Sequence, residues 1–215
     1  MAAVKARSSR RDVNLAATRA HTLQSARRLF LEKGYLGTTI EAVAREAGVA
    51  VQTVYNAVGN KAALLAGVFE DTVSGPEAPR PAPAFLQERS EAVADVGGIV
   101  RLLGAWFVEV HARMAPVWKL LEEAAAHDEG LAAFARKRAH QRLRNYELAA
   151  AQIQKRGGLA GMTLEEAAAL IWTVGHPLVY RTLVLEQRWP AERYRRWVEK
   201  ALRAALVPAR RGGRT

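Results

Sequence analysis

Cysteine is absent from the 215-residue sequence, which excludes disulfide frameworks, thiolate metal sites and cysteine nucleophiles. The absence fits a reducing cytosol, where disulfides are rare. Aromatic residues are only 7% of the chain, and its 16 glycines and 8 prolines exclude collagen-like and low-complexity classes. The composition is that of a globular protein, long enough for one or two domains with a sizeable core.

Long apolar runs are also missing from the sequence. No stretch reaches the roughly 18 uninterrupted apolar residues of a transmembrane helix. Residues 1–20 lack the apolar core of a secretory signal. We therefore expect a cytoplasmic location and no membrane partner.

Charge is the first feature that indicates a partner. The 32 Lys and Arg residues exceed the 21 Asp and Glu residues, which gives a net charge of +11. This excess favours a polyanion, either nucleic acid or an anionic membrane surface, although a generally basic soluble surface has the same composition. Residues 1–16 are interpreted as a disordered basic arm that could follow phosphates, or as a terminus without a role.

Helix-forming residues dominate the chain and alternating strand patterns are scarce, so the predicted fold class is all-α. The clearest break is at residues 74–83, where four prolines cannot continue a helix. This break predicts a first domain at 17–73 and a second at 84–207, followed by a flexible tail at 208–215.

The first domain has the start and stop signals of several short helices. Residues 18–33 carry an apolar stripe, and Gly34 is suited to end that helix in a left-handed conformation. Thr38 and Thr39 precede Ile40 and Glu41 in a capping-box pattern. Asn60 is a good N-cap for the helix that follows it.

Two helices of about two turns, joined at Gly48, predict a helix-turn-helix. Small apolar residues allow the two helices to cross closely. The outward face of the second helix, residues 51–58, is expected to show four polar side chains that suit base edges and phosphates, namely Gln52, Thr53, Tyr55 and Asn56. An ordinary pair of surface helices is the alternative interpretation of the same spacing.

Three segments of this domain resemble the DNA-binding domain of TetR/AcrR-type bacterial transcriptional regulators. They are residues 34–49 (GYLGTTIEAVAREAGV), 53–55 (TVY) and 61–65 (KAALL). The resemblance covers roughly residues 18–70. It implies a homodimer that places two recognition helices in successive major grooves of a palindromic double-stranded DNA operator. It also implies release by a small-molecule effector bound in an all-helical C-terminal domain, most often in a repressor associated with the nucleoid.

The resemblance assigns roles to individual positions. Thr38 and Thr39 would cap the second helix and contact phosphate, Tyr55 would hold phosphate, and Lys61 would anchor to the DNA backbone. The residues that would face bases are Gln52, Thr53 and Asn56. Three positions depart from the family pattern: Ala50 replaces a capping Ser or Thr, Gln52 replaces a small residue, and Ala57-Val58 replaces an aromatic pair. We include Ala50 in the predicted DNA-binding surface.

The second domain is predicted to contain helices at 85–113, 117–126, 130–156, from Thr163 onward with a restart at Pro177, and at 191–206. Apolar residues on the last two exceed the need of one small helix pair. The resemblance implies that these helices form a four-helix bundle between two chains. The alternative is that they cover the core of a monomer.

Effector contacts are predicted from aromatic and histidine residues on otherwise apolar helices, because small-molecule sites are mostly apolar with a few polar groups. The candidates are Trp106, His111, Trp118, Phe134, Tyr146, Trp172 and His176. Each is also a plausible core residue. We expect no metal and no cofactor, because no histidine pair has a ligand spacing with a carboxylate.

Two other functions compete with that of a DNA-binding regulator. An enzyme on a helical bundle would need a nucleophile–base pair or a metal constellation, and the sequence shows no HExxH, GxSxG or phosphate-binding loop. We therefore expect no catalytic residues. A basic protein that binds nucleic acid or membrane surfaces without sequence preference remains the third possibility, and salt dependence and sequence preference distinguish it.

Overall fold

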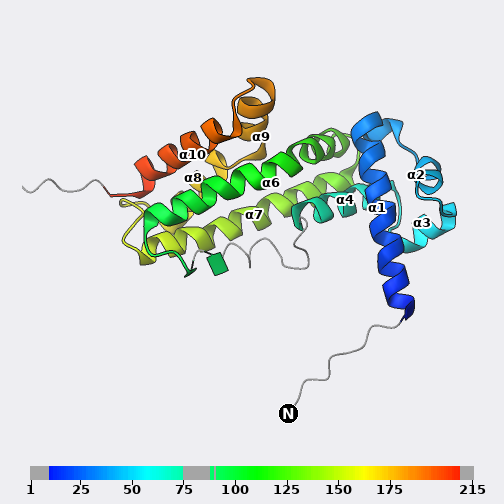
Figure 1. Ribbon diagram of the computed structural model, residues 1–215, viewed down its shortest axis with the longest axis horizontal. Coiled ribbons are helices and arrows are strands. Elements are labelled where there is room, and N and C mark those ends of the chain that lie inside the picture. Colours follow the sequence, from blue (N-terminus) through cyan, green and yellow to red (C-terminus); the bar gives the residue numbers. More distant parts are fainter. Residues whose placement is uncertain (1–9, 75–87, 90, 209–215) are drawn as a thin grey trace, which may run out of the picture. The chain divides into compact units, whose positions relative to one another are not determined.

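The computed structural model describes residues 10–74, 88–89 and 91–208, and every regular element among them is a helix (Figure 1). The predicted all-α fold class is confirmed. The chain divides into two compact units. The first contains residues 1–72 and 119–134, and the second contains residues 73–118 and 135–215.

The first unit begins with α1 (Arg10–Gly37). The helix is interrupted at Gly34, the predicted stop, because the positive φ of 73° at this residue separates the last turn from the rest. The start of α1 corrects the predicted disordered arm at 1–16, since residues 10–16 are helical. Ala16 and Ala17 are strong helix formers, and the Thr18 hydroxyl donates to the Asn14 carbonyl at 2.9 Å within this turn. The rest of the predicted arm lies outside the described residues.

Three short helices pack beside α1, and we call these four helices together the head (Figure 1). They are α2 (Ile40–Glu46), α3 (Val51–Ala57) and α4 (Lys61–Ser74). Asn60 caps α4 as predicted, because its Oδ1 accepts from the Ala63 N–H at 2.9 Å. Their buried apolar side chains form one core with α1, including Phe30, Val43, Val54, Leu64 and Phe69.

The first unit also takes in residues 119–134, which join the C-terminal end of α6 (Val96–Ala125) to the start of α7 (Glu129–Lys155). Phe134 of α7 packs edge-to-face on Phe69 of α4, with ring centroids 5.6 Å apart. Burial raises the pKa of Tyr35, and the charge of Asp128 raises it further. The helical hairpin of α6 and α7 therefore supplies part of the head's packing, which a boundary drawn at the proline-rich segment does not include.

Helix α6 corrects two sequence predictions. It begins at Val96, so the predicted helix at 85–113 starts too early, and its first residues lie outside the described part of the chain. Pro116 lies inside α6 and does not separate two helices at 113 and 117. Pro116 removes the hydrogen bond to the Ala112 carbonyl, and both residues are exposed, so water can solvate that group.

The second unit is completed by α8 (Leu164–Val174), α9 (Pro177–Tyr180), the π-helix η1 (Arg181–Glu186) and α10 (Ala191–Leu206). Thr163 and Glu166 form the predicted capping box of α8. His176 caps the restart at Pro177, with its Nδ1 accepting from the Leu178 N–H at 3.1 Å. The core of this unit is built from one cluster of buried side chains, including Phe107, Tyr146, Ile171, Tyr194 and Leu202.

One stretch, Leu164–Glu186, is long and apolar enough to cross a membrane by length and composition. It comprises α8, α9 and η1, with a break in the helix at Gly175–His176. Only 28% of its apolar window is buried inside the protein. A single stretch of this kind is weak evidence for a membrane span, because interface helices also combine apolar composition with exposure.

Candidate nucleic-acid interface and effector site

The helix-turn-helix predicted from the sequence is present as α2 and α3. Gly48 connects them with a φ of 63°, a conformation that favours glycine. Val43 and Ala44 of α2 and Val54 of α3 are fully or almost fully buried. Their small size lets the helices approach closely and leaves the opposite side of α3 free to meet a ligand.

The exposed side of α3 is polar. Tyr55 is 46% exposed, and Gln52 and Asn56 are exposed beside it. The Gln52 Nε2 donates to the Asn56 Oδ1 at 3.0 Å, one helical turn away. This pairing leaves Gln52 Oε1, one N–H of Gln52 and both N–H groups of Asn56 available, and such amides match the donor and acceptor of adenine in a major groove. We call Gln52, Tyr55 and Asn56 the reading surface.

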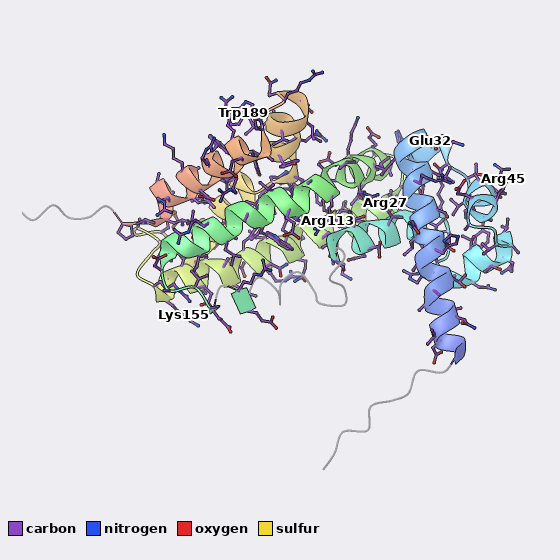
Figure 2. The ribbon with its side chains drawn as sticks, in the orientation of Figure 1. Arg27, Glu32, Arg45, Arg113, Lys155 and Trp189 are labelled. Carbon is purple, nitrogen blue, oxygen red and sulfur yellow. The ribbon has the colours of Figure 1, made fainter. Side chains whose placement is uncertain are left out.

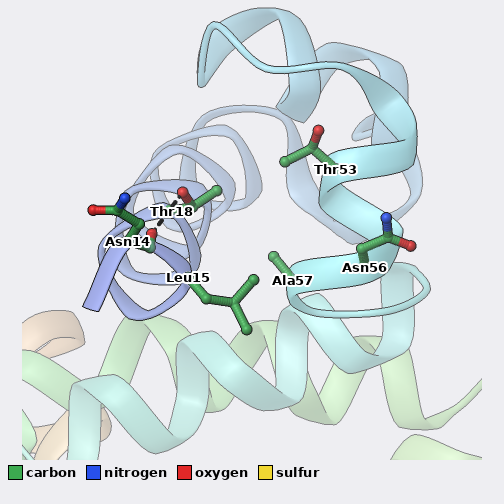
Figure 3. Close-up of a pocket in the computed structure, with 6 residues that line it drawn as sticks. All are labelled: Asn14, Leu15, Thr18, Thr53, Asn56 and Ala57. Atoms are coloured by element: carbon green, nitrogen blue, oxygen red, sulfur yellow. Dashed lines mark hydrogen bonds between the residues drawn. The ribbon is translucent and has the colours of Figure 1, made fainter. Parts of the chain in front are cut away.

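Thr53 occupies a different side of α3 from Gln52 and Tyr55. It is half-buried and lines a groove of about 500 Å³ between α3 and the N-terminal part of α1 (Figure 3). The groove is also lined by Asn14, Leu15, Thr18, Asn56 and Ala57. Asn56 therefore belongs to both the reading surface and the groove, and α1 extends this polar surface beyond the helix-turn-helix.

The two threonines before α2 have different roles, and this corrects one prediction. Thr39 is the N-cap, and its Oγ1 accepts from the Ala42 N–H at 3.1 Å. Thr38 is 1% exposed, and its hydroxyl donates inward, 2.9 Å from the Gly34 carbonyl and 3.2 Å from that of Leu29. A buried hydroxyl cannot reach phosphate, so the side chain of Thr38 holds the end of α1.

The other predicted contacts frame the reading surface. Ala50 is the exposed N-cap of α3 and makes no side-chain capping bond. Lys61 begins α4, where its Nζ donates to the Leu36 carbonyl at 3.3 Å and lies 4.5 Å from the ring centre of Tyr35. Burial lowers the pKa of Lys61. Arg45 of α2 projects outward from the head (Figure 2) and adds an exposed cation that the sequence prediction did not single out.

In the second unit, His111 is one of two predicted effector residues with a titratable group that are almost fully buried. It is 3% exposed, and its Nε2 lies 2.9 Å from the Gly175 carbonyl at the end of α8. Its ring stacks on Phe107 at 5.8 Å. Burial lowers the pKa of His111 to about 3, although the bond to Gly175 opposes the shift. His111 is therefore neutral at ordinary pH.

His176 lies between two of the predicted tryptophans. Its ring meets Trp172 at 5.0 Å and Trp118 at 6.0 Å, both edge-to-face. The guanidinium of Arg142, on α7, lies over both indoles, 5.0 Å from the Trp118 centre and 5.1 Å from the Trp172 centre. We call Arg142, Trp118, Trp172, His176 and His111 the Arg142 cluster.

The structure brings together most of the predicted effector residues but not all of them. Tyr146 joins the cluster through Phe107, whose ring it meets at 5.9 Å, and burial raises the Tyr146 pKa to about 12. Trp106 is half-buried against the same core. Phe134 is separate, because it packs with Phe69 in the first unit.

Sequence reasoning missed Arg142. It stands in a helix rich in exposed basic residues, where one more arginine gives no signal of its own. A signal was available in its spacing, since Arg142 is four residues before Tyr146 and so shares a helix face with that buried aromatic residue.

Comparison with known proteins agrees with the helix-turn-helix in the head. Residues 23–68 match the family model described as bacterial regulatory proteins, tetR family. A search of curated proteins gave no match.

Three similar solved structures cover almost the whole chain. A protein of Mesorhizobium loti assigned to the TetR family is 19% identical, with a TM-score of 0.70 over 92% of this chain and 96% of that one. SmeT, solved with triclosan, is 21% identical, with a TM-score of 0.71 over 90% and 93%. NalD, the secondary repressor of the MexAB-OprM multidrug efflux pump in Pseudomonas aeruginosa, is 23% identical, with a TM-score of 0.66 over 90% and 98%.

A helix-turn-helix head followed by a helical domain defines a DNA-binding transcriptional regulator. The head therefore matches the tetR family over residues 23–68, and the whole chain has the fold of the solved TetR-family regulators.

Proposed function

We propose that the chain is a cytoplasmic repressor that binds a palindromic operator as a homodimer and is released by a small molecule. The observation that carries this proposal is the exposed reading surface of α3, mounted on a buried apolar base. A single helix-turn-helix makes few base contacts, and doubling it on two half-sites gives the specificity that a repressor needs. The net charge of +11 supports binding to a phosphate backbone.

Exposed apolar residues near the end of the chain support the homodimer. Leu178 is 43% exposed, Leu185 is 50% exposed and Trp197 is 39% exposed. They come from α9, η1 and α10, where the family forms its bundle between two chains. Large exposed apolar residues close together in the chain favour a protein partner, and a second copy would cover the same surface on both protomers.

Helix α6 supplies a physical route for effector release. Its residue Trp118 belongs to the Arg142 cluster, and the next turns of the same helix carry Glu123 and Ala124. Those residues, with His127, line a cavity of about 280 Å³ against residues 33–37, where α1 meets α2. A ligand that displaces Trp118 would therefore move the support of the helix-turn-helix. Coupling of this kind is typically about 1–3 kcal/mol.

The test is binding to a fluorescent duplex from the upstream region of the protein's own gene, measured by anisotropy at several salt concentrations. We expect two protomers per duplex and tighter binding than to a scrambled duplex at matched salt. Equal affinity for both duplexes at every salt concentration would show a non-specific basic protein.

Variants assign the binding to the reading surface. Tyr55→Phe keeps the ring but removes the hydroxyl expected at phosphate. A hydrogen bond to a charged group is worth about 1.5–3 kcal/mol, so binding should weaken at least about 10-fold. The unfolding midpoint should not change, because Tyr55 is exposed. Tyr35→Phe is the control, since that ring is half-buried and stacks on Phe30. If both variants bind like the wild type, Tyr55 is not a DNA contact.

A further inference from the structure

Arg142 is a cation with unfilled hydrogen-bonding capacity. Its Nε and Nη2 are inaccessible to solvent, and neither has a hydrogen-bond partner among the described residues. It lies over the indole faces of Trp118 and Trp172, which attract a cation but accept no directional hydrogen bond in its plane. Buried charges are normally paired with an opposite charge, so this arrangement is unusual.

The two unfilled positions lie on one edge of the guanidinium. Nε–H and the adjacent Nη2–H point in the same direction, and this edge matches the two oxygens of a carboxylate. The Nε1 of Trp172, whose ring the guanidinium covers, is also buried without an acceptor. Three N–H donors of the cluster therefore have no hydrogen-bond acceptor among the described residues.

The charges around the cluster favour an anion. The groups whose charges act on His111 are Arg142 and His176, and neither is acidic. For Arg142 the corresponding group is Tyr146, which is neutral because burial raises its pKa to about 12. No carboxylate of the described chain forms an ion pair with Arg142. His111 Nδ1, buried and unpartnered, adds a possible acceptor for a ligand hydroxyl.

We propose that the Arg142 cluster binds a small organic acid, with its carboxylate on the Nε–Nη2 edge of Arg142 and its apolar body among the surrounding aromatic rings. The proposal rests on the function proposed above, because it names the chemical class of the effector. Trp118 and Trp172 form the walls of the site, and Trp172 donates a further hydrogen bond. The carboxylate supplies the negative charge that the partly buried guanidinium lacks.

The test compares acids with amides of the same shape on the full chain. The probes are 2-naphthoate with 2-naphthamide and decanoate with decanamide, titrated by tryptophan fluorescence and by thermal shift. At least one acid should bind 10-fold or more tightly than its amide. Amides as tight as their acids, or no saturable binding of either acid up to millimolar concentration, would overturn the proposal.

Variants locate the acid. Arg142→Gln should reduce acid affinity at least 10-fold and leave amide affinity unchanged, and Arg142→Lys should restore only part of it because ammonium lacks the two-donor edge. Arg136→Gln, at an exposed position on the same helix, is the matched control. Acid binding that is unchanged in Arg142→Gln would overturn the assignment. The wild-type comparison of acid with amide remains decisive where a variant does not fold.

A parallel DNA measurement separates this proposal from the proposed function. An acid that binds through Arg142 should also lower operator affinity. If the acid binds and the DNA complex is unaffected, the site stands and effector release fails. If no duplex is preferred over another, the operator proposal fails and the thermal shifts still decide the Arg142 site.

Discussion

The reading surface in the first unit and the Arg142 cluster in the second show two ways of keeping polar groups available for a ligand. Gln52, Tyr55 and Asn56 are exposed, so water satisfies them until DNA arrives. Arg142 and His111 are held among aromatic rings, where water does not reach Arg142 Nε or His111 Nδ1.

This difference has an energetic consequence. A side chain on the reading surface can change without altering the free energy of unfolding, because it leaves no buried group unpaired. A change in the Arg142 cluster alters folding and ligand binding together, because buried polar groups carry a desolvation penalty.

Acid should destabilise the protein through its buried histidine. Burial lowers the pKa of His111 to about 3, with Arg142 and His176 lowering it further against the opposing bond to Gly175. A histidine in the unfolded chain titrates near pH 6.5, so between about pH 6.5 and 3 the unfolded state binds one more proton. The free energy of unfolding should therefore fall by about 1.4 kcal/mol per pH unit through this range. Above pH 6.5 the contribution is constant.

Urea unfolding at pH 7 and pH 4.5 measures this loss, which should be about 3 kcal/mol at the lower pH. His111→Asn removes the titrating group, and its difference in stability from the wild type should shrink by the same amount. Parallel pH profiles for the two proteins would mean that His111 is accessible to protons in the folded state.

A methyl group should have opposite consequences in the two units. A Cβ at Gly175 would overlap the ring of Phe107, which is itself fully buried. At Gly37, in the first unit, the nearest atom would be the Lys33 Cβ at an ordinary 3.5 Å. Gly175→Ala should lower the free energy of unfolding by about 1–3 kcal/mol, because overpacking forces the core to shift. Gly37→Ala should be neutral or slightly stabilising.

Denaturant midpoints of the two glycine variants provide the comparison. Gly175→Ala should also impair the binding of acids, because the Gly175 carbonyl positions His111. DNA binding by Gly37→Ala should match the wild type. Equal stability of both variants would show that the packing around Phe107 adjusts more easily than the contact geometry indicates.

Features set by nearby residues could be predicted from the sequence. Three kinds of local feature are as predicted. They are the positive φ of Gly34 and Gly48, the helix caps at Asn60 and Thr163, and the helix at 191–206. Each depends on the conformation of one residue or on a hydrogen bond spanning three residues. Most of the reading surface follows from similar local signals, because the turn at Gly48 and the apolar Val54 fix which side of α3 faces outward. Thr53, predicted on that side, is instead half-buried in the groove beside α1.

Features set by distant contacts could not be predicted in this way. Pro116 is tolerated inside α6 although its local effect is to end a helix. Thr38 and Thr39 are equivalent by sequence, and only the packing of α1 buries the first. Arg142 gains its role from Trp118 and Trp172, which are 24 and 30 positions away on two other helices. The candidate effector site is therefore visible only in the folded chain.

The smallest expected effects concern α2 and α3, the two helices of the helix-turn-helix. Thr39 caps α2 through the Ala42 N–H, whereas Ala50, at the same position of α3, has no side-chain acceptor. Thr39→Ala should lower the free energy of unfolding by about 1 kcal/mol. Ala50→Ser should raise it by a similar or smaller amount, because Ala50 already has the extended φ and ψ of −68° and 148° that a capping residue adopts.

Urea unfolding of both single variants and of the double variant tests this pair. The sites are on different helices, so the effects should nearly cancel in the double variant if they are independent. The four helices of the head contain no tryptophan, so tryptophan fluorescence reports unfolding around the Arg142 cluster. That fluorescence transition should change little in these variants. If Ala50→Ser gives no gain, a group other than a side chain already satisfies the first turn of α3. The start of α3 would then need no side-chain cap in the free protein, and the added hydroxyl would change only the affinity for DNA phosphate.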